Sequence, residues 1–246
     1  MRLLGKTAIV TGGASGFGAG IVRKFIAEGA TVMVADINGD AARAMADEVG
    51  GISCTVDVAK SDSVKAMAEA AIAQMGHIDI LVNNAGITHL PTQMEDVTEE
   101  EFDRVMAVNT KSVFLTAKHL IPHMKSRGTG AVLNVASTAG VSPRPRLNWY
   151  NASKGWMITA TKTMAIELAP EGVRVNAINP VAGETPLLKS FMGEDTPEIR
   201  AKFISTIPIG RLSTPEDMGN AACFLCSDEA SMITGVALEV DGGRCI

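Results

Sequence analysis

The chain has 246 residues, 46% of them hydrophobic, so it can bury one sizeable core, and the simplest prediction is a single domain over residues 1–246. A formal net charge of −5 and the lack of any lysine or arginine cluster argue against nucleic acid and anionic membrane as partners. No apolar run is long enough to span a bilayer, and the first predicted strand leaves no room for a signal peptide, so a cytoplasmic protein is expected.

Apolar strands and helical patterns alternate along the chain. Strands are predicted at 6–11, 31–36, 52–58, 78–84, 131–137, 173–180 and 236–240. Helices are predicted at 16–29, 41–49, 63–76, 98–127, 150–169 and 215–226, with a loop-rich segment at 181–212. Near-continuous apolar strands are typical of a sheet whose two faces are both covered by helices. The pattern therefore predicts an α/β doubly wound Rossmann fold with a mostly parallel seven-stranded sheet.

The turn after the first strand, TGGASGFG, is rich in glycine. Its glycines leave backbone amides uncovered, and the next helix points its positive end at the turn, which suits a pyrophosphate. The spacing is not the common G-x-G-x-x-G, and the Lys-Ser/Thr pair of a triphosphate-binding loop is missing. Alternatively, the glycines serve only close strand–helix packing. The residues expected to contact a dinucleotide here are Gly12, Ser15, Gly16, Phe17 and Gly18.

An aspartate, Asp36, ends the second predicted strand. A carboxylate in this place can accept hydrogen bonds from both hydroxyls of an adenosine ribose and would repel a 2′-phosphate. Ile37 follows and offers no positive charge, so NAD is favoured over NADP. Alternatively, Asp36 only starts a turn. Further cofactor contacts are expected at the ends of the next two strands, from Asp57, Val58, Asn84, Ala85 and Gly86.

The only tyrosine, Tyr150, precedes Lys154 by four residues in a predicted helix, so the two side chains share one helix face. The ammonium would favour the phenolate and lower a side-chain pKa that is about 10 when unperturbed. Ser137 ends a buried strand, at the sheet edge where parallel sheets bind ligands. Taken alone, the pair can also be a surface pair and the serine a cap. Asn109 interrupts a long helical region, where it either disturbs the hydrogen-bond ladder or is a satisfied buried amide.

These motifs occur in one order along one chain: TGxxxGxG, Asp36, NNAG, Asn109, Ser137, Tyr150-x-x-x-Lys154 and Asn179-Pro180. Together they resemble the short-chain dehydrogenase/reductase family from end to end. The resemblance implies hydride transfer between a nicotinamide cofactor and a secondary alcohol or ketone of a small or medium-sized metabolite.

The resemblance also implies a role for each site residue. Tyr150 would be the general acid and base, and Ser137 would hold the substrate oxygen. Lys154 would bind the nicotinamide ribose and lower the tyrosine pKa, and Asn109 would anchor a water in a proton relay. Further cofactor contacts implied are Pro180, Val181, Gly183 and Thr185. Val181 departs from the family pattern, in which a glycine usually follows Asn-Pro.

The long segment 181–212 is expected to form a lid over the substrate. The candidate substrate residues are Ser137, Arg144, Arg146, Trp149, Tyr150, Leu187 and Phe191. The two arginines can grip a carboxylate, phosphate or sulfonate by paired hydrogen bonds; alternatively they are solvated loop residues.

Several other functions remain open from the sequence. Within the family they are a 3-oxoacyl thioester reductase, for which a basic residue would be expected in place of Ile37, and a sugar or polyol 1-dehydrogenase. A methyltransferase also places an acidic residue on a ribose. An NAD-sensing regulator on the same fold is the non-enzyme alternative.

No metal is expected, because the Cys223-x-x-Cys226 pair lies inside a helical pattern with no second ligand pair, which favours core packing.

The predicted helix over 155–169 carries small or apolar residues on most of its circumference. One side can pack on the sheet and the other on another subunit, and the family resemblance implies a homotetramer or homodimer.

Overall fold

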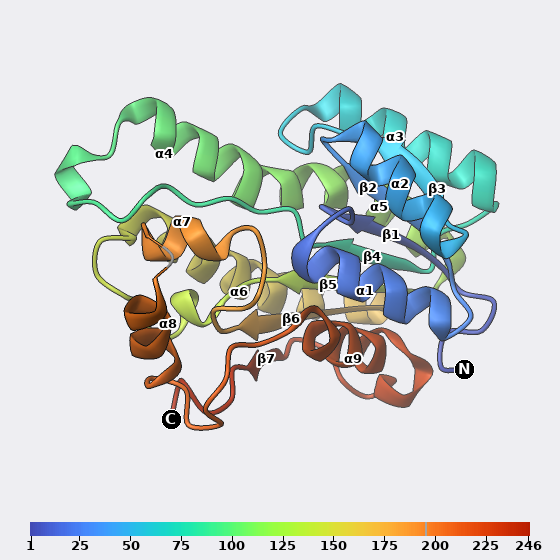
Figure 1. Cartoon of the computed structure of the whole chain (residues 1–246). Helices are drawn as coiled ribbons and strands as arrows, with labels where there is room; N and C mark the ends of the chain where they lie inside the picture. The colour runs from blue at the N-terminus through green and yellow to red at the C-terminus, as the bar shows by residue number, and fades with distance from the viewer. Residues whose placement is uncertain (195) are drawn as a thin grey trace.

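The computed structural model describes residues 1–194 and 196–246. In this part of the chain seven parallel strands form one sheet in the order β3-β2-β1-β4-β5-β6-β7. They are β1 (Thr7–Thr11), β2 (Thr31–Asp36), β3 (Ile52–Thr55), β4 (Ile80–Asn83), β5 (Gly130–Val135), β6 (Val173–Pro180) and β7 (Ala237–Val240). The predicted doubly wound α/β fold is therefore confirmed (Figure 1).

Helices cover both faces of the sheet because neighbouring strand residues point to opposite sides. Val10 of β1 packs in one buried cluster with residues of α1 (Gly16–Ala27), α2 (Gly39–Val49) and α9 (Pro215–Cys226). Ile9, its neighbour, packs in the opposite cluster. That cluster draws on α3 (Ser61–Met75), α5 (Ser112–Arg127) and α6 (Asn148–Leu168).

The strand order reverses at β1, which lies between β2 and β4. From β1 the chain winds outward first to β2 and β3, and then in the other direction from β4 to β7. Connections on the two sides of this point diverge and leave a crevice beyond the carboxyl ends of the strands. The fold thus places the turn after β1 and the end of β4 beside each other.

The long helical region predicted at 98–127 consists of α4 (Glu99–Met106), a π-helical segment (Ala107–Lys111) and α5. A capping box starts it: the Thr98 side chain accepts from the Glu101 amide, while the Glu101 carboxylate accepts from the Thr98 amide. Asn109 lies inside the π-helical segment. The regular α-helical hydrogen-bond ladder is therefore disturbed at the residue for which the sequence suggested a disturbance.

The segment 181–212 contains two short helices in addition to the expected loops, α7 (Leu188–Met192) and α8 (Pro197–Ile204). Thr196 caps α8 by accepting from the Ile199 amide, and Pro197 occupies the first turn. The same Thr-Pro-Glu signal opens α9 at Thr214, so the sequence did hold a sign of α8. Figure 1 shows α7 and α8 close together at the end of the molecule that is far from the amino terminus.

Cys223 and Cys226 are buried in the sheet-facing side of α9, as expected for core residues. Burial raises the pKa of the Cys226 thiol to about 12, which disfavours the thiolate that redox chemistry needs.

Among the described residues, none of the helices has the length and apolar character needed to cross a membrane.

Candidate active site

A cavity of about 690 Å³ opens at the carboxyl ends of the strands. Its walls come from the turn after β1, the ends of β2, β4, β5 and β6, the start of α6, and the lid segment. We call one part the glycine-turn end, formed by Gly12, Ser15, Gly16, Phe17, Asp36 and Ile37. We call the other part the Tyr150 end, formed by Ser137, Arg144, Tyr150, Phe191 and Phe203.

Most residues singled out in the sequence line this one cavity. Of the expected cofactor contacts, those that line it are Gly12, Ser15, Gly16, Phe17, Asp36, Ile37, Asp57, Val58, Asn84, Ala85, Gly86, Tyr150, Lys154, Pro180, Val181, Gly183 and Thr185. Of the substrate candidates, those that line it are Ser137, Arg144, Arg146, Tyr150, Leu187 and Phe191. Gly18, Asn109 and Trp149 are not part of its lining.

The glycine turn has a backbone that side chains would obstruct. Gly12 and Gly16 have φ angles of +62° and +53°, in the left-handed region that favours glycine. A Cβ on Gly18 would lie 2.1 Å from the Gly12 carbonyl oxygen, so the close packing of the turn requires glycine at this position. The Asn84 side chain braces the turn by donating to the carbonyls of Thr11 (2.9 Å) and Gly12 (3.0 Å). This cradle fits a pyrophosphate beside the positive end of α1.

Asp36 is held at the rim of the cavity by backbone amides. One carboxylate oxygen accepts from the Ala14 amide (3.1 Å) and the other from the Asn38 amide (3.0 Å). Ile37 beside it is 71% exposed. The lysine and arginine side chains among the described lining residues are Arg144, Arg146 and Lys154, none of which belongs to the glycine-turn end. Asp36 is therefore a carboxylate at this end that lacks a neighbouring lining cation.

Asp57 lines the same cavity after β3, but its carboxylate already has local partners. One oxygen accepts from the Ala59 amide at 3.0 Å, and the other lies 3.2 Å from the Lys60 ammonium. The side chain is thus fixed by its own loop.

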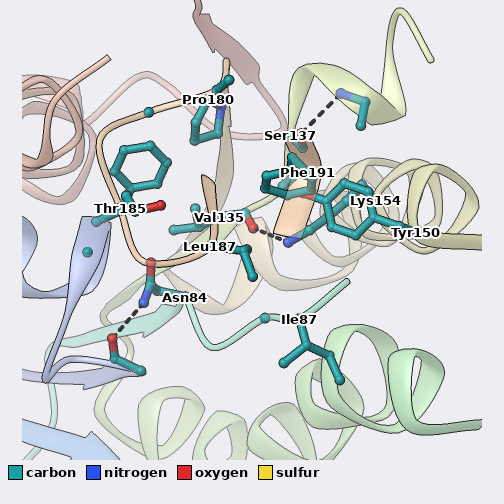
Figure 2. Close-up of a pocket in the computed structure, with 18 of the residues that line it drawn as sticks. Asn84, Ile87, Val135, Ser137, Tyr150, Lys154, Pro180, Thr185, Leu187 and Phe191 are labelled. Carbon is teal, nitrogen blue, oxygen red and sulfur yellow. Dashed lines mark hydrogen bonds between the residues drawn. The ribbon is translucent and has the colours of Figure 1, made fainter. Parts of the chain in front are cut away.

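Tyr150 and Lys154 lie on one face of α6, as the four-residue spacing predicted, and both are buried. The Lys154 ammonium donates to the Val135 carbonyl at the end of β5 (2.9 Å), and its nitrogen lies 5.9 Å from the centroid of the Tyr150 ring. Figure 2 shows Lys154 between the Tyr150 ring and Val135, with Ser137 next along the chain from that strand. The Ser137 hydroxyl accepts from the Ala139 amide (3.1 Å).

Burial sets the protonation of this pair. It raises the pKa of Tyr150 to about 12, although a hydrogen bond with the Ser137 side chain acts in the opposite direction. Burial also lowers the pKa of Lys154 to about 8. In the polypeptide by itself the pKa of Tyr150 is thus raised, not lowered as predicted, because desolvation disfavours the phenolate.

Asn109 is a satisfied buried amide. Its oxygen accepts from the Ile87 amide (2.9 Å), and its nitrogen donates to the Ile87 carbonyl (2.9 Å) and to the Ser153 hydroxyl (2.9 Å). Ser153 in turn donates to the Tyr150 carbonyl (2.7 Å). Through these bonds the π-helical segment ties the loop after β4 to the helix that carries Tyr150.

The lid segment packs through its own small core. Val181, the residue that departs from the family pattern, is 4% exposed and packs with Leu188, Ile207 and Leu212. A glycine at this position would contribute no side chain to the packing of this cluster. Phe191 of α7 contacts Tyr150 with its ring, at a centroid distance of 5.1 Å (Figure 2).

Two substrate candidates that precede Tyr150 differ from the expectation: Trp149, in the first turn of α6, lies outside the cavity lining, and Arg146 lines the cavity but is exposed. The Trp149 indole donates to the Met94 carbonyl (3.2 Å), and its ring packs edge-on against Phe102 at 5.4 Å. The prediction that Trp149 contacts substrate is therefore wrong, because the indole is used in anchoring α4. Arg146 is exposed and has a left-handed φ of 70°, while Arg144 is partly buried.

Sequence reasoning missed two contributors to the Tyr150 end. Phe203 of α8 lines the cavity, and the Arg144 guanidinium lies 4.6 Å from the centroid of its ring. Asn151 also lines the cavity, and its amide nitrogen donates to the Arg144 carbonyl (2.7 Å), which fixes the loop before α6. For Phe203 the sequence offers one sign, the Thr-Pro pair that predicts the start of α8. For Asn151 it offers only the position next to Tyr150.

Comparisons with known proteins agree with this geometry. A family model described as enoyl-(acyl carrier protein) reductase matches residues 12–244. The 4-formylbenzenesulfonate dehydrogenase of Comamonas testosteroni is 51% identical, with all of both chains covered.

Two solved structures also resemble the chain closely. A 3-ketoacyl-(acyl-carrier-protein) reductase from Brucella melitensis, complexed with NADH, superimposes with a TM-score of 0.95 at 50% identity, covering 99% of this chain and 100% of that one. A 7α-hydroxysteroid dehydrogenase complexed with NADH and 7-oxo glycochenodeoxycholic acid gives a TM-score of 0.93 at 38% identity, covering 98% and 95%.

A Rossmann fold whose cavity joins a glycine turn to a buried tyrosine–lysine pair defines a nicotinamide-dependent oxidoreductase. The chain belongs to the short-chain dehydrogenase/reductase family. Its reaction is oxidoreduction between an alcohol and a carbonyl compound.

Proposed function

We propose that the protein transfers hydride between NAD and a small or medium-sized secondary alcohol or its ketone, with Tyr150 as the acid and base. The observation that carries this proposal is the convergence of the glycine turn, Asp36 and the buried Tyr150–Lys154 pair on one cavity. A pyrophosphate fits the turn, an adenosine ribose fits Asp36, and the reacting carbon then belongs at the Tyr150 end.

Tyr150 and Ser137 hold the substrate oxygen through their hydroxyl groups. During oxidation the Tyr150 oxygen takes the alcohol proton as hydride leaves the same carbon, and during reduction it returns a proton to the carbonyl oxygen. When bound, the nicotinamide accepts or supplies the hydride, and its oxidised ring carries a positive charge.

Lys154 is the cation that the chain itself provides. A phenol with a pKa of about 12 is a poor acceptor at neutral pH, so positive charge close to Tyr150 is needed. The pKa of Lys154, about 8, leaves most of its ammonium charged at pH 7. We assign the nicotinamide ribose to Lys154, whose nitrogen lies next to Gly86 in the cavity wall, 3.4 Å from where a Cβ on that glycine would be.

Asn109 acts in this proposal as a positioning residue. Its contacts with Ile87 and Ser153 hold the loop after β4 at a fixed distance from α6. The family resemblance also implies that Asn109 anchors a water of a proton relay. Because its side chain is already hydrogen-bonded, we assign that water to the backbone of the π-helical segment, which stays a prediction.

The preference for NAD over NADP rests on Asp36. Its carboxylate is fixed by two amides at the rim of the cavity, and Ile37 offers no charge to a 2′-phosphate. The two solved relatives with NADH bound are consistent with this choice.

The substrate we propose is a carbonyl compound or alcohol of limited size. The relative that is 51% identical is named for an aromatic aldehyde, which supports a small substrate here. The second candidate is a 3-oxoacyl thioester reductase, favoured by the name of a solved structure that is 50% identical. A sugar or polyol 1-dehydrogenase remains a further alternative.

Oligomerisation is part of the proposal. The α5 and α6 helices leave three large apolar side chains exposed, Phe114 (56%), Trp156 (41%) and Ile166 (78%). Large exposed apolar side chains are candidates for an interaction surface, and together with the family resemblance they lead us to propose a homotetramer or homodimer. Mass measurement in solution tests it, and a monomer at working concentration would contradict it. The cytoplasmic location stays a prediction.

The experiment that tests the function is NADH or NADPH formation with secondary alcohols, sugars and 3-hydroxyacyl thioesters. We expect small secondary alcohols to be oxidised, with kcat/KM for NAD above that for NADP by at least about tenfold, equivalent to ~1.4 kcal/mol. Faster turnover of the thioesters would favour the thioester reductase. Tight NADH binding without turnover of any compound, in either direction, would favour the NAD-sensing regulator and overturn the proposal.

A further inference from the structure

Two phenyl rings from the lid border the Tyr150 end of the cavity. Phe191 of α7 contacts the Tyr150 ring edge-on at 5.1 Å. Phe203 of α8 lies under the guanidinium of Arg144 at 4.6 Å. All four residues line the cavity, so aromatic rings border its Tyr150 end. Such walls favour a planar ring, which stacks on them in offset or edge-to-face geometry.

A second guanidinium, from the carboxyl-terminal segment, contacts a residue of the cavity wall, although it is not itself part of the lining. Arg244 donates to the hydroxyl of Ser142 (3.3 Å), a cavity-lining residue that is 102 positions earlier in the chain. The segment is held there by Asp241, whose carboxylate accepts from the amides of Gly243 (2.9 Å) and Cys245 (2.8 Å). The Ile209 amide also donates to the Gly242 carbonyl (3.1 Å). Figure 1 shows the carboxyl terminus below α8, in agreement with these bonds.

Arg144 and Arg244 interact with each other as like charges. Burial and the neighbouring Arg244 both lower the pKa of Arg144. The Arg144 side chain donates to the Thr206 hydroxyl (2.9 Å), and the Nε atom of Arg244 is buried without a hydrogen-bond partner. Over residues 1–194 and 196–246, neither guanidinium has a carboxylate within 4.0 Å. In this part of the chain, partly buried positive charge thus has hydroxyl groups and the Phe203 ring as neighbours but no neutralising carboxylate, and a bound anion would supply the missing negative charge.

We propose that Arg144 and Arg244 form an anion-binding site at the Tyr150 end, which selects substrates carrying a sulfonate or carboxylate on an aromatic ring opposite the reacting carbon. This inference rests on the proposed function. It differs from the pair Arg144 and Arg146 suggested by the sequence. Arg146 also lines the cavity but is exposed, whereas Arg244 is only partly exposed and is held against the lining residue Ser142 by a hydrogen bond. Guanidinium groups suit this task, since their planar fork binds two oxygens of one anion.

The test compares matched ketones that differ only in charge: acetophenone, 4-acetylbenzenesulfonate and 4-acetylbenzoate. Wild type should reduce the anionic ketones with kcat/KM about 10- to 100-fold above acetophenone, the gain expected from charged hydrogen bonds. In Arg144→Gln and in Arg244→Gln the ratio of anionic to neutral kcat/KM should fall by about tenfold or more. Arg104→Gln, an exposed arginine of α4 outside the cavity, is the matched control and should keep the wild-type ratio.

Three outcomes would overturn the inference while leaving the proposed function intact. One is equal kcat/KM for charged and neutral ketones in wild type. Another is a preference that survives in both variants. The third is a preference lost only in Arg146→Gln, which would assign the anion to the loop before α6.

If none of the ketones is reduced, that result counts against the proposed function. A calorimetric titration still tests the anion site in that case. Benzenesulfonate added to the protein with NADH present should bind wild type and Arg104→Gln and bind Arg144→Gln and Arg244→Gln at least about tenfold more weakly. Equal binding by all four proteins, or none by wild type, would overturn the anion site independently of turnover.

Discussion

The glycine-turn end of the cavity is made of strand ends and the turns that follow them, whereas the Tyr150 end adds loops, two short helices and the carboxyl-terminal segment. At the first end, contacts join neighbouring strands, such as Asn84 after β4 to the carbonyls at the end of β1. At the second, contacts join distant parts of the chain: Arg144 to Thr206, 62 residues apart, and Arg244 to Ser142, 102 apart. The first end is thus a product of the sheet, and the second depends on how the lid and the carboxyl-terminal segment pack.

The largest expected effect separates chemistry from cofactor binding. Changing Tyr150 to phenylalanine removes the only group at the Tyr150 end that we assign to proton transfer, so kcat should fall by about 10²- to 10⁴-fold. NADH affinity, followed by fluorescence titration, should change by less than about twofold, since the glycine-turn end is untouched. Near-normal turnover in this variant would show that the proton moves by another group.

The sequence was sufficient for the glycine-turn end because each of its features is local. The turn at Gly12, Asp36 at a strand end and the Asn84 region each follow a strand, and a parallel sheet brings all carboxyl ends to one edge. The bounds of β2, β6 and α9 also match the predicted ranges.

The Tyr150 end was less predictable for the opposite reason. Nothing near Arg244 in the sequence indicates that Asp241 folds the carboxyl-terminal segment back toward Ser142. Phe203 becomes a cavity wall only because α8 packs over the loop before α6. The raised pKa of Tyr150 could not be predicted either, because it depends on burial, which residue spacing does not report.

The second prediction concerns the buried charge at Lys154. Its pKa is about 8 in the folded protein and 10.5 when unperturbed. Between these values the unfolded chain binds a proton that the folded protein does not, so wild-type stability should rise with pH in this window. Urea unfolding at pH 7 and pH 10 should show wild type gaining up to about 3 kcal/mol relative to Lys154→Met. A difference independent of pH would mean that Lys154 is not desolvated, and the Tyr150 end would then be more open than described.

The smallest expected effect lies in the lid. Val181→Ala removes two methyl groups from the cluster with Leu188, Ile207 and Leu212, and should lower the free energy of unfolding by about 1–2 kcal/mol. Val141→Ala, at a position 45% exposed, is the control and should be close to neutral. An equal effect of both substitutions in urea unfolding would show that the lid core does not contribute to stability as the structure indicates.

Because the two ends of the cavity are built from different parts of the chain, we predict that they act independently on the transition state. The most direct measurement is a double-mutant cycle with Asp36→Ala and Arg144→Gln, reading the initial rate with NADH and 4-acetylbenzenesulfonate both far below their KM values. Independence predicts that the two losses in transition-state free energy add to within about 0.5 kcal/mol. A coupling energy above about 1 kcal/mol would contradict the claim and show that the cofactor and substrate ends are built as one unit.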